Sequence, residues 1–204
     1  MKTYTGMPHL YGNVLAAIDF ETTGNEPGYH EIIQVAVVPL DSQLNPHPDM
    51  RPFYSNVAPE YPERAEKEAE ETHNLDLNKL ILEAPSKDRV AQMLHEWFVK
   101  LDLPISKRLV PLAQNWSFES GFLNEWLGIH LKEEIFHHAV RDPMINASFW
   151  NDRMVFHGEK HPFNRIGLLS LCNILGVTNE NPHDALSDAI ATAHVYRAML
   201  LKEF

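Results

Sequence analysis

The chain has 204 residues, of which 44% are apolar and 22% are charged, and its formal net charge is −11. A chain of this length and composition can bury a sizeable core, which excludes a disordered, fibrous or disulfide-built protein. It contains no run of about 18 or more apolar residues, and its start lacks the profile of a signal peptide, so we expect a cytoplasmic protein without membrane association. The acidic balance disfavours extended nucleic-acid binding but suits a site for hard divalent cations.

The cysteine content limits the kinds of metal site, and the organisation of the chain limits the number of domains. The single cysteine, Cys172, cannot form an internal disulfide or a cysteine-rich zinc site, so oxygen or imidazole must hold any metal. No repeat, low-complexity tract or flexible linker divides the sequence. We therefore expect residues 1–204 to form one domain.

The first half of the chain is predicted to form strands followed by helices. Two apolar runs, residues 14–21 and 31–40, flank a turn at residues 24–28 and predict a β-hairpin, and residues 52–57 predict a third strand. Helices that cover the sheet are predicted over residues 59–72 and 87–101.

The second half alternates between strands and helices. A buried strand is predicted over residues 109–113, and a helix over residues 117–127 with Gly128 as its stop. The remaining segments are a strand over residues 139–144 and helices over residues 166–175 and 185–201. This order indicates an α/β sandwich with a mixed sheet.

The sequence I-D-F-E-T-T-G at residues 18–24 is the most informative stretch. Side chains alternate faces along a strand, so Asp19 and Glu21 point the same way, about 7 Å apart. Two carboxylates so placed repel each other unless a cation lies between them. The alternative is a strand edge whose acids face water.

Two further groups of polar residues follow. In Q-N-W-S-F-E at residues 114–119, Glu119 falls in the first turn of a helix, where the helix dipole favours a carboxylate whatever its function. In H-D-A-L-S-D at residues 183–188, His183 and Asp188 open the last helix, and Asp184 is better explained as its N-cap. Taken alone, His183 is an ordinary surface histidine.

In this order, D-x-E-T-T-G, N-x-x-F-acid and H-x-x-x-x-D resemble the motifs of the DEDD-type 3′-to-5′ exonucleases, in the subclass whose last motif carries histidine. The family includes polymerase proofreading subunits, RNase T and oligoribonuclease, and the resemblance covers about residues 14–200. It implies the RNase H-like fold, a mixed five-stranded sheet flanked by helices.

The resemblance also implies roles for individual residues. Asp19, Glu21, Glu119 and Asp188 would hold two Mg²⁺ or Mn²⁺ ions, and His183 would be the general base. Such chemistry needs an activated water and a stabilised leaving oxygen, which two cations roughly 4 Å apart supply. Oxygen ligands suit Mg²⁺, and imidazole titrates near neutral pH.

Four more residues occupy positions that lie beside the terminal nucleotide in the family. Thr22, Thr23 and Asn115 would contact this nucleotide, and Trp116 would offer a surface on which a base stacks, a contact worth about 1–3 kcal/mol. The simpler interpretation is that the first three are turn residues and that Trp116 belongs to the core.

The second motif departs from the family pattern at two positions. The family normally has aspartate where this chain has Glu119, and commonly histidine where it has Gln114. Glutamate is still an oxygen ligand but is one methylene longer, so either the helix lies farther back or the metal geometry changes.

The leading hypothesis is a metal-dependent exonuclease that removes nucleotides from 3′ ends of single strands, with DNA preferred over RNA. The alternatives are RNA trimming and a nucleic-acid-end binding domain with an attenuated site. Partners beyond the substrate are left open between a second copy of the chain and a polymerase-type protein. Residues 137–165 carry net charge +1 against −12 for the rest of the chain, so they could guide the strand, although a solvated loop is the more ordinary explanation.

Overall fold

A mixed β-sheet forms the centre of the protein in the computed structural model, which describes residues 7–202. The strands are β1 (Val14–Thr22), β2 (Ile32–Pro39), β3 (Phe53–Asn56) and β4 (Leu109–Leu112), in the order β3-β2-β1-β4. β2 is antiparallel to β1 and to β3, and β4 is parallel to β1. The predicted hairpin, third strand and mixed sheet are therefore confirmed.

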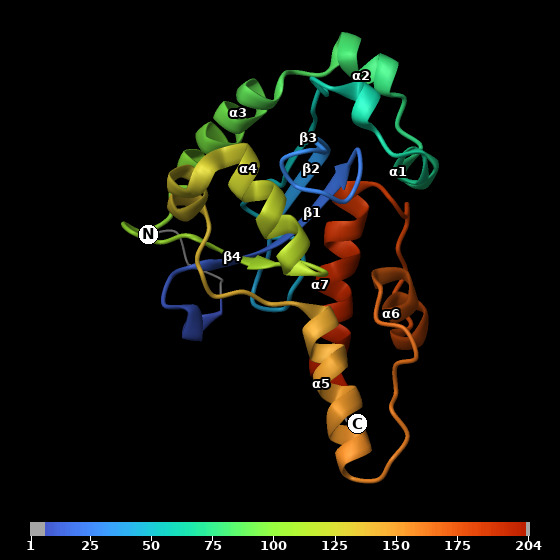
Figure 1. The fold of residues 1–204 in the computed structure, drawn as a ribbon. Coiled ribbons are helices and arrows are strands. Elements are labelled where there is room, and N and C mark those ends of the chain that lie inside the picture. The colour runs from blue at the N-terminus through green and yellow to red at the C-terminus, as the bar shows by residue number, and fades with distance from the viewer. Residues whose placement is uncertain (1–6, 203–204) are drawn as a thin grey trace.

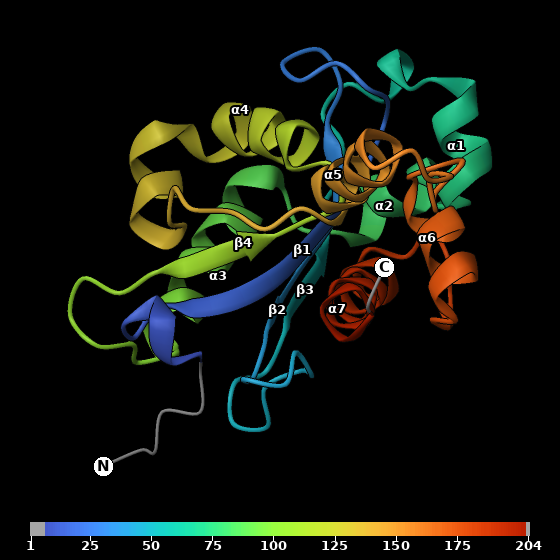
Figure 2. The ribbon, with the colours of Figure 1, turned by 90° about the horizontal axis from the view of Figure 1, so that it is seen from below.

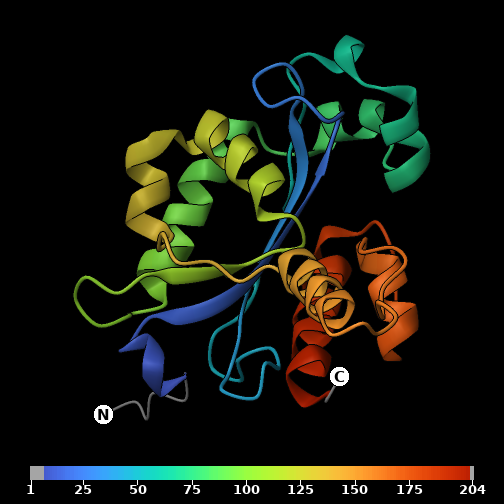
Figure 3. The same cartoon turned by 60° about the horizontal axis from the view of Figure 1, so that its bottom comes forward.

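Helices cover both faces of this sheet (Figures 1 and 3). α3 and α4 pack on one face, α7 packs on the other, and α5 and α6 lie against α7. The bounds are η1 (Pro8–Leu10), η2 (Pro62–Arg64), α1 (Lys67–His73), α2 (Leu77–Glu83), α3 (Lys87–Lys100), α4 (Trp116–Ile135), α5 (Pro143–Phe156), α6 (Leu168–Leu175) and α7 (Ala185–Leu201). None of the helices in residues 7–202 is both long and apolar enough to cross a membrane.

The alternation of side chains along β1 assigns each residue to one of two cores. Ile18 and Phe20 pack with the apolar residues of α3 and α4, whereas Leu15 and Ala17 pack with α7. Asp19 and Glu21 continue the face of Leu15 and Ala17. The hydrophobic face that packs on α7, on the other side of the sheet from α3 and α4 in Figure 2, therefore becomes acidic where β1 ends, near the start of α7 (Figure 1).

The predicted fifth strand, residues 139–144, is absent. This segment meets β4 at a single isolated bridge, between Arg141 and Leu112, and a second bridge pairs Phe136, before the segment, with Leu109. Pro111 of β4 has no N–H, and it can only accept, through its carbonyl, from the Arg141 N–H. With this gap in the ladder the chain pairs at two points only, so the sheet has four strands.

Two helical predictions also need correction. Gly128 interrupts α4, with φ 67° and ψ 162°, but the chain resumes helical geometry beyond it instead of stopping. The helix α5 was not predicted, although the pair Asp142-Pro143 is a typical helix start: the Asp142 carboxylate caps the Met144 N–H, and proline needs no partner in the first turn.

Candidate active site

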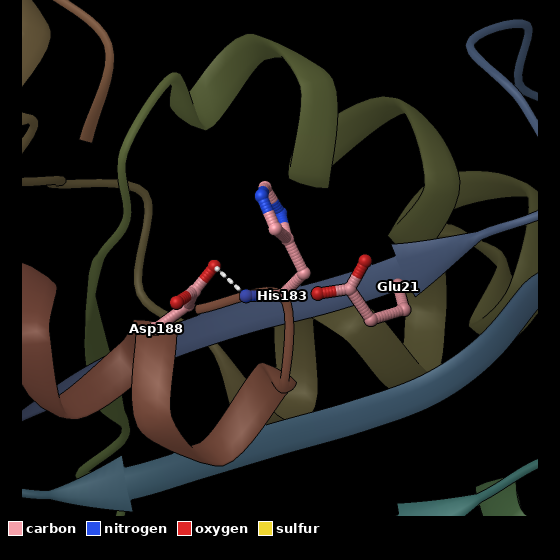
Figure 4. Close-up of side chains that lie close together, drawn as sticks. All are labelled: Glu21, His183 and Asp188. Atoms are coloured by element: carbon pink, nitrogen blue, oxygen red, sulfur yellow. Dashed lines mark hydrogen bonds between the residues drawn. The ribbon is translucent and has the colours of Figure 1, made fainter. Parts of the chain in front are cut away.

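Three polar side chains from distant parts of the sequence meet where β1 ends. One ligand atom from each of Glu21, His183 and Asp188 lies within 4.8 Å of the other two. Figure 4 shows the Glu21 carboxylate reaching from β1 toward the loop that carries His183, while Asp188 enters from the first turns of α7. Carboxylate and imidazole atoms at this spacing form a potential site for a cation.

The backbone at His183 is bent tightly around Asp188. His183 has a φ of 66°, in the left-handed region, and its N–H donates to Asp188 Oδ2 at 3.3 Å (Figure 4). The imidazole itself is exposed and points away from that carboxylate. The ring therefore faces the open side of the site, where a substrate would arrive.

The start of α7 is fixed to the sheet by two long-range hydrogen bonds. Tyr54 of β3 donates its hydroxyl hydrogen to Asp184 Oδ2 at 2.6 Å, and Gln34 of β2 accepts from the Ala185 N–H at 2.8 Å. Asp184 also accepts from the Ser187 N–H, which confirms that it is an N-cap. These contacts set the position of the His183 loop relative to β1.

Asp19 and Glu119 join Glu21 and Asp188 in one acidic group at the end of β1. Asp19 is the one residue of β1 that is not fully buried, and burial followed by the charges of Asp188, Glu119 and Glu21 raises its pKa well above the ordinary value. Burial also raises the pKa of Glu119 well above its ordinary value. The charge of Asp188 acts on Asp19 more strongly than that of Glu119, in keeping with the grouping of Asp188 with Glu21.

The pKa values of the other two carboxyls are raised as well. Burial, together with the charges of Asp188 and Asp184, raises the pKa of Glu21 to about 8, and burial raises that of Asp188. Burial disfavours the ionised forms of all four acids, and the charges of neighbouring carboxylates add to this for Asp19 and Glu21, so cations between them would stabilise the ionised forms. The donor set consists of oxygen and imidazole, which fits a divalent cation.

Glu119 provides a second observation that the site suits a bound cation. Its side chain is 4% exposed, and its Oε2 has no hydrogen-bond partner. A buried carboxylate oxygen without a donor is costly and uncommon. A bound cation would provide the missing partner, so glutamate at this position remains a candidate ligand despite its extra methylene.

Asp142 organises the second motif, a role that the sequence analysis missed. Its buried carboxylate accepts from the backbone N–H groups of Asn115, Trp116 and Met144, at 3.2, 2.9 and 2.8 Å. It therefore joins the starts of α4 and α5, and thereby places Glu119 on α4. Asn115 is in the left-handed region, with a φ of 70°, which this double acceptance supports.

The four predicted nucleotide contacts have internal partners. The Thr22 hydroxyl donates to the Gly24 carbonyl at 2.7 Å, and the fully buried Thr23 hydroxyl accepts from the Glu31 N–H at 2.9 Å. Asn115 accepts from the Ser117 hydroxyl, and Trp116 packs against the core with the Lys132 ammonium 5.5 Å from its ring centre. Their contact with a nucleotide stays a prediction.

The amide of Gln114, at the position where the family commonly has histidine, faces inward. Its Nε2 donates to the Ile166 carbonyl at 2.7 Å, and its Oε1 is buried without a partner. Gln114 thus ties the start of α4 to the segment before α6.

A hollow of about 260 Å³ adjoins the acidic group. Glu21 and Thr22 line it together with Phe118 of α4 and His73 at the end of α1. His73 is 6% exposed, accepts from the Leu75 N–H through Nδ1, and leaves Nε2 without a partner. No local pattern around residues 67–73 indicated this position, because only the packing of α1 brings it to β1.

Comparison with known proteins agrees with this geometry. A model of the RNase_T family, described as exonuclease, matches residues 16–196. No curated protein sequence matches the chain.

Several solved structures share the fold. The crystal structure of cell-death related nuclease 4 is 19% identical over 93% of this chain and 64% of its own, with a TM-score of 0.65. The nuclease domain of 3′hExo, a DEDDh family member bound to rAMP, is 20% identical over 94% and 93%, with a TM-score of 0.63. E. coli exonuclease I in complex with a dA16 oligonucleotide is 17% identical over 94% and 41%, with a TM-score of 0.70.

This chain therefore spans less than two thirds of cell-death related nuclease 4 and less than half of exonuclease I. The family match covers most of residues 7–202, and the motifs and the arrangement of sheet and helices agree with it. The chain belongs to the exonuclease family described by this model, and it shares the RNase H-like fold of the DEDDh nuclease domain of 3′hExo.

Proposed function

We propose that the protein removes nucleotides from the 3′ end of single-stranded nucleic acid, with DNA preferred over RNA. The observation that carries this proposal is the meeting of Glu21, His183 and Asp188 within 4.8 Å, beside the partly buried Asp19 and the buried Glu119. Few other reactions need four carboxylates and a free imidazole at one sheet edge.

The four carboxylates would hold two divalent cations, Mg²⁺ or Mn²⁺. Cations bound there would acidify the attacking water and stabilise the departing 3′ oxygen of the sugar. The unpartnered Oε2 of Glu119 and the raised pKa values of Asp19 and Glu21 support this assignment. Both ions have the oxygen preference that this donor set satisfies.

His183 would act as the general base. Its ring is exposed beside Glu21 and Asp188 (Figure 4), so it would reach a water beside the scissile phosphate. The His183 N–H holds Asp188 while the ring stays available, which separates the structural role of the backbone from the catalytic role of the side chain.

The hollow beside Glu21 would receive the terminal nucleotide. Phe118 offers an aromatic face at its wall, and the His73 ring offers a nitrogen without a partner. Stacking does not read base identity, so we expect little sequence preference. The backbone around Thr22 and Asn115, whose side chains have internal partners, would contact the sugar and phosphate.

The preference for DNA over RNA is the finer part of the proposal. Structures that share the fold include both a DNA complex, E. coli exonuclease I with dA16, and an rAMP complex, 3′hExo. RNA trimming is the second candidate, because the same site cleaves both strands and contacts to the 2′-OH distinguish them.

A time course with 5′-labelled single-stranded DNA and RNA of matched sequence, in Mg²⁺, Mn²⁺ or EDTA, tests the proposal. A descending ladder that needs both the cation and Asp19, with the Asp19→Ala variant as the comparison, is the expected result. Faster shortening of RNA would overturn the DNA preference. Binding of strand ends without turnover in any metal would overturn the enzyme proposal in favour of a binding domain.

A further inference from the structure

A chain of hydrogen bonds leads to Asp188 from the loop between α6 and α7. Asn179, in the loop between α6 and α7, donates from Nδ2 to Asp188 Oδ1 at 2.6 Å. Ser187 donates its hydroxyl hydrogen to Asn179 Oδ1 at 2.7 Å, and the Ser187 oxygen accepts from the Asn181 N–H at 2.9 Å. Each donor in this chain fixes the orientation of the next group.

The chain permits only one orientation of the Asn179 amide. An ionised Asp188 carboxylate only accepts hydrogen bonds, so the Asn179 NH₂ and not its Oδ1 faces Asp188. In the same orientation Oδ1 accepts from the Ser187 hydroxyl, whose oxygen accepts from the Asn181 N–H. The other Asp188 oxygen accepts from the His183 N–H. Both oxygens of the carboxylate are therefore held, while each retains a lone pair for another partner.

We propose that Asn179 is a positioning residue for Asp188, with Ser187 fixing the Asn179 amide, and that this pair sets the affinity of the site for divalent cations. The proposal rests on the proposed function, in which Asp188 is a ligand. Without Asn179 the carboxylate can rotate about its side chain, and the geometry that a cation needs is lost for part of the time. Partners behind a metal ligand typically account for 10–100-fold in metal affinity.

The direct test is Mn²⁺ binding without nucleic acid, measured by electron paramagnetic resonance of the free ion. Asn179→Leu, which keeps the approximate volume and removes the donor, should weaken binding by about 10–100-fold. Ser187→Ala should weaken it less, since the amide stays beside Asp188 but is free to flip. The kcat on a labelled oligonucleotide should fall in parallel, with KM for the strand little changed.

Asn151→Leu is the matched control. Asn151 also makes two amide hydrogen bonds, to the backbone carbonyl and N–H of Phe163, but it lies outside the acidic group. It should lower thermal stability and leave Mn²⁺ affinity unchanged. If Asn179→Leu lowers Mn²⁺ affinity no more than Asn151→Leu does, the positioning role is refuted.

A double-mutant cycle with Asp188→Asn separates this inference from the proposed function. Once Asp188 is replaced, Asn179→Leu should cause little further loss of Mn²⁺ affinity, because its effect passes through that carboxylate. Equal losses in both backgrounds would show a general structural effect and overturn the inference. If Asp188→Asn itself leaves Mn²⁺ binding intact, the proposed cation site is what fails.

Discussion

Replacing Glu21 by glutamine should stabilise the cation-free protein above neutral pH, although it removes a candidate catalytic group. Burial and the charges of Asp188 and Asp184 raise the Glu21 pKa from 4.5 to about 8. The folded chain therefore keeps a proton that the unfolded chain releases. Stability from this group is fully present below pH 4.5 and is lost as the pH rises toward 8.

The magnitude follows from the size of the shift. Each pH unit between the two pKa values costs about 1.4 kcal/mol, so this single group lowers the free energy of unfolding by about 3 kcal/mol at pH 7. Between pH 5 and pH 7 this group lowers the free energy of unfolding by about 2–3 kcal/mol. Asp19, Glu119 and Asp188, whose pKa values are also raised, add to it with the same sign.

Urea unfolding in EDTA at pH 5, 6, 7 and 8 measures this effect. The unfolding free energy of the wild type should decline with pH more steeply than that of Glu21→Gln, while Glu133→Gln, at an exposed position on α4, should follow the wild type. Adding Mn²⁺ should reverse the order, because cations stabilise the ionised carboxylates. Parallel pH profiles for the wild type and Glu21→Gln would refute the reasoning.

Three further changes test other parts of the site. Asp142→Ala leaves three backbone N–H groups without their acceptor and should lower the free energy of unfolding by about 3 kcal/mol in urea titrations, against little change for the exposed Asp152→Ala. A loss below about 1 kcal/mol would argue against the joining role of Asp142. Glu119→Gln should lower kcat on a labelled strand by about 100-fold or more. If it changes nothing while Glu119→Asp raises the rate greatly, the natural side chain is not a ligand. Charge reversal at Arg153 and Lys160, both exposed, should raise KM for the strand and leave kcat unchanged, and an unchanged KM would exclude strand guidance by residues 137–165.

The sequence alone determined the local elements and the faces of β1. The bounds predicted for α7 match the structure, because its apolar residues recur with the period of a helix and Asp184 caps it. The shared face of Asp19 and Glu21 follows from the period of two along a strand, which no tertiary contact changes. The order of three motifs also made His183, Asp188 and Glu119 candidate site residues, and the structure brings His183 and Asp188 to Glu21.

Sequence failed where an element depends on pairing between distant segments. Residues 139–144 were expected to form a strand, but the missing N–H of Pro111 limits their pairing with β4 to one isolated bridge, and Asp142-Pro143 begins α5. Gly128 was taken as a stop because glycine often ends a helix, whereas here the chain resumes its helix after one non-helical residue.

Only the tertiary structure decided how the site is assembled. The hydrogen bond between Gln34 and the Ala185 N–H joins residues 151 positions apart and brings α7 to the end of β1. Asp142 and Asn179, which have no distinctive pattern around them, acquire roles because packing buries Asp142 beside backbone N–H groups and places the partly buried Asn179 beside Asp188. Periodicity specifies which face a side chain occupies, but partners that satisfy buried charges come from wherever the fold places a donor within hydrogen-bond distance.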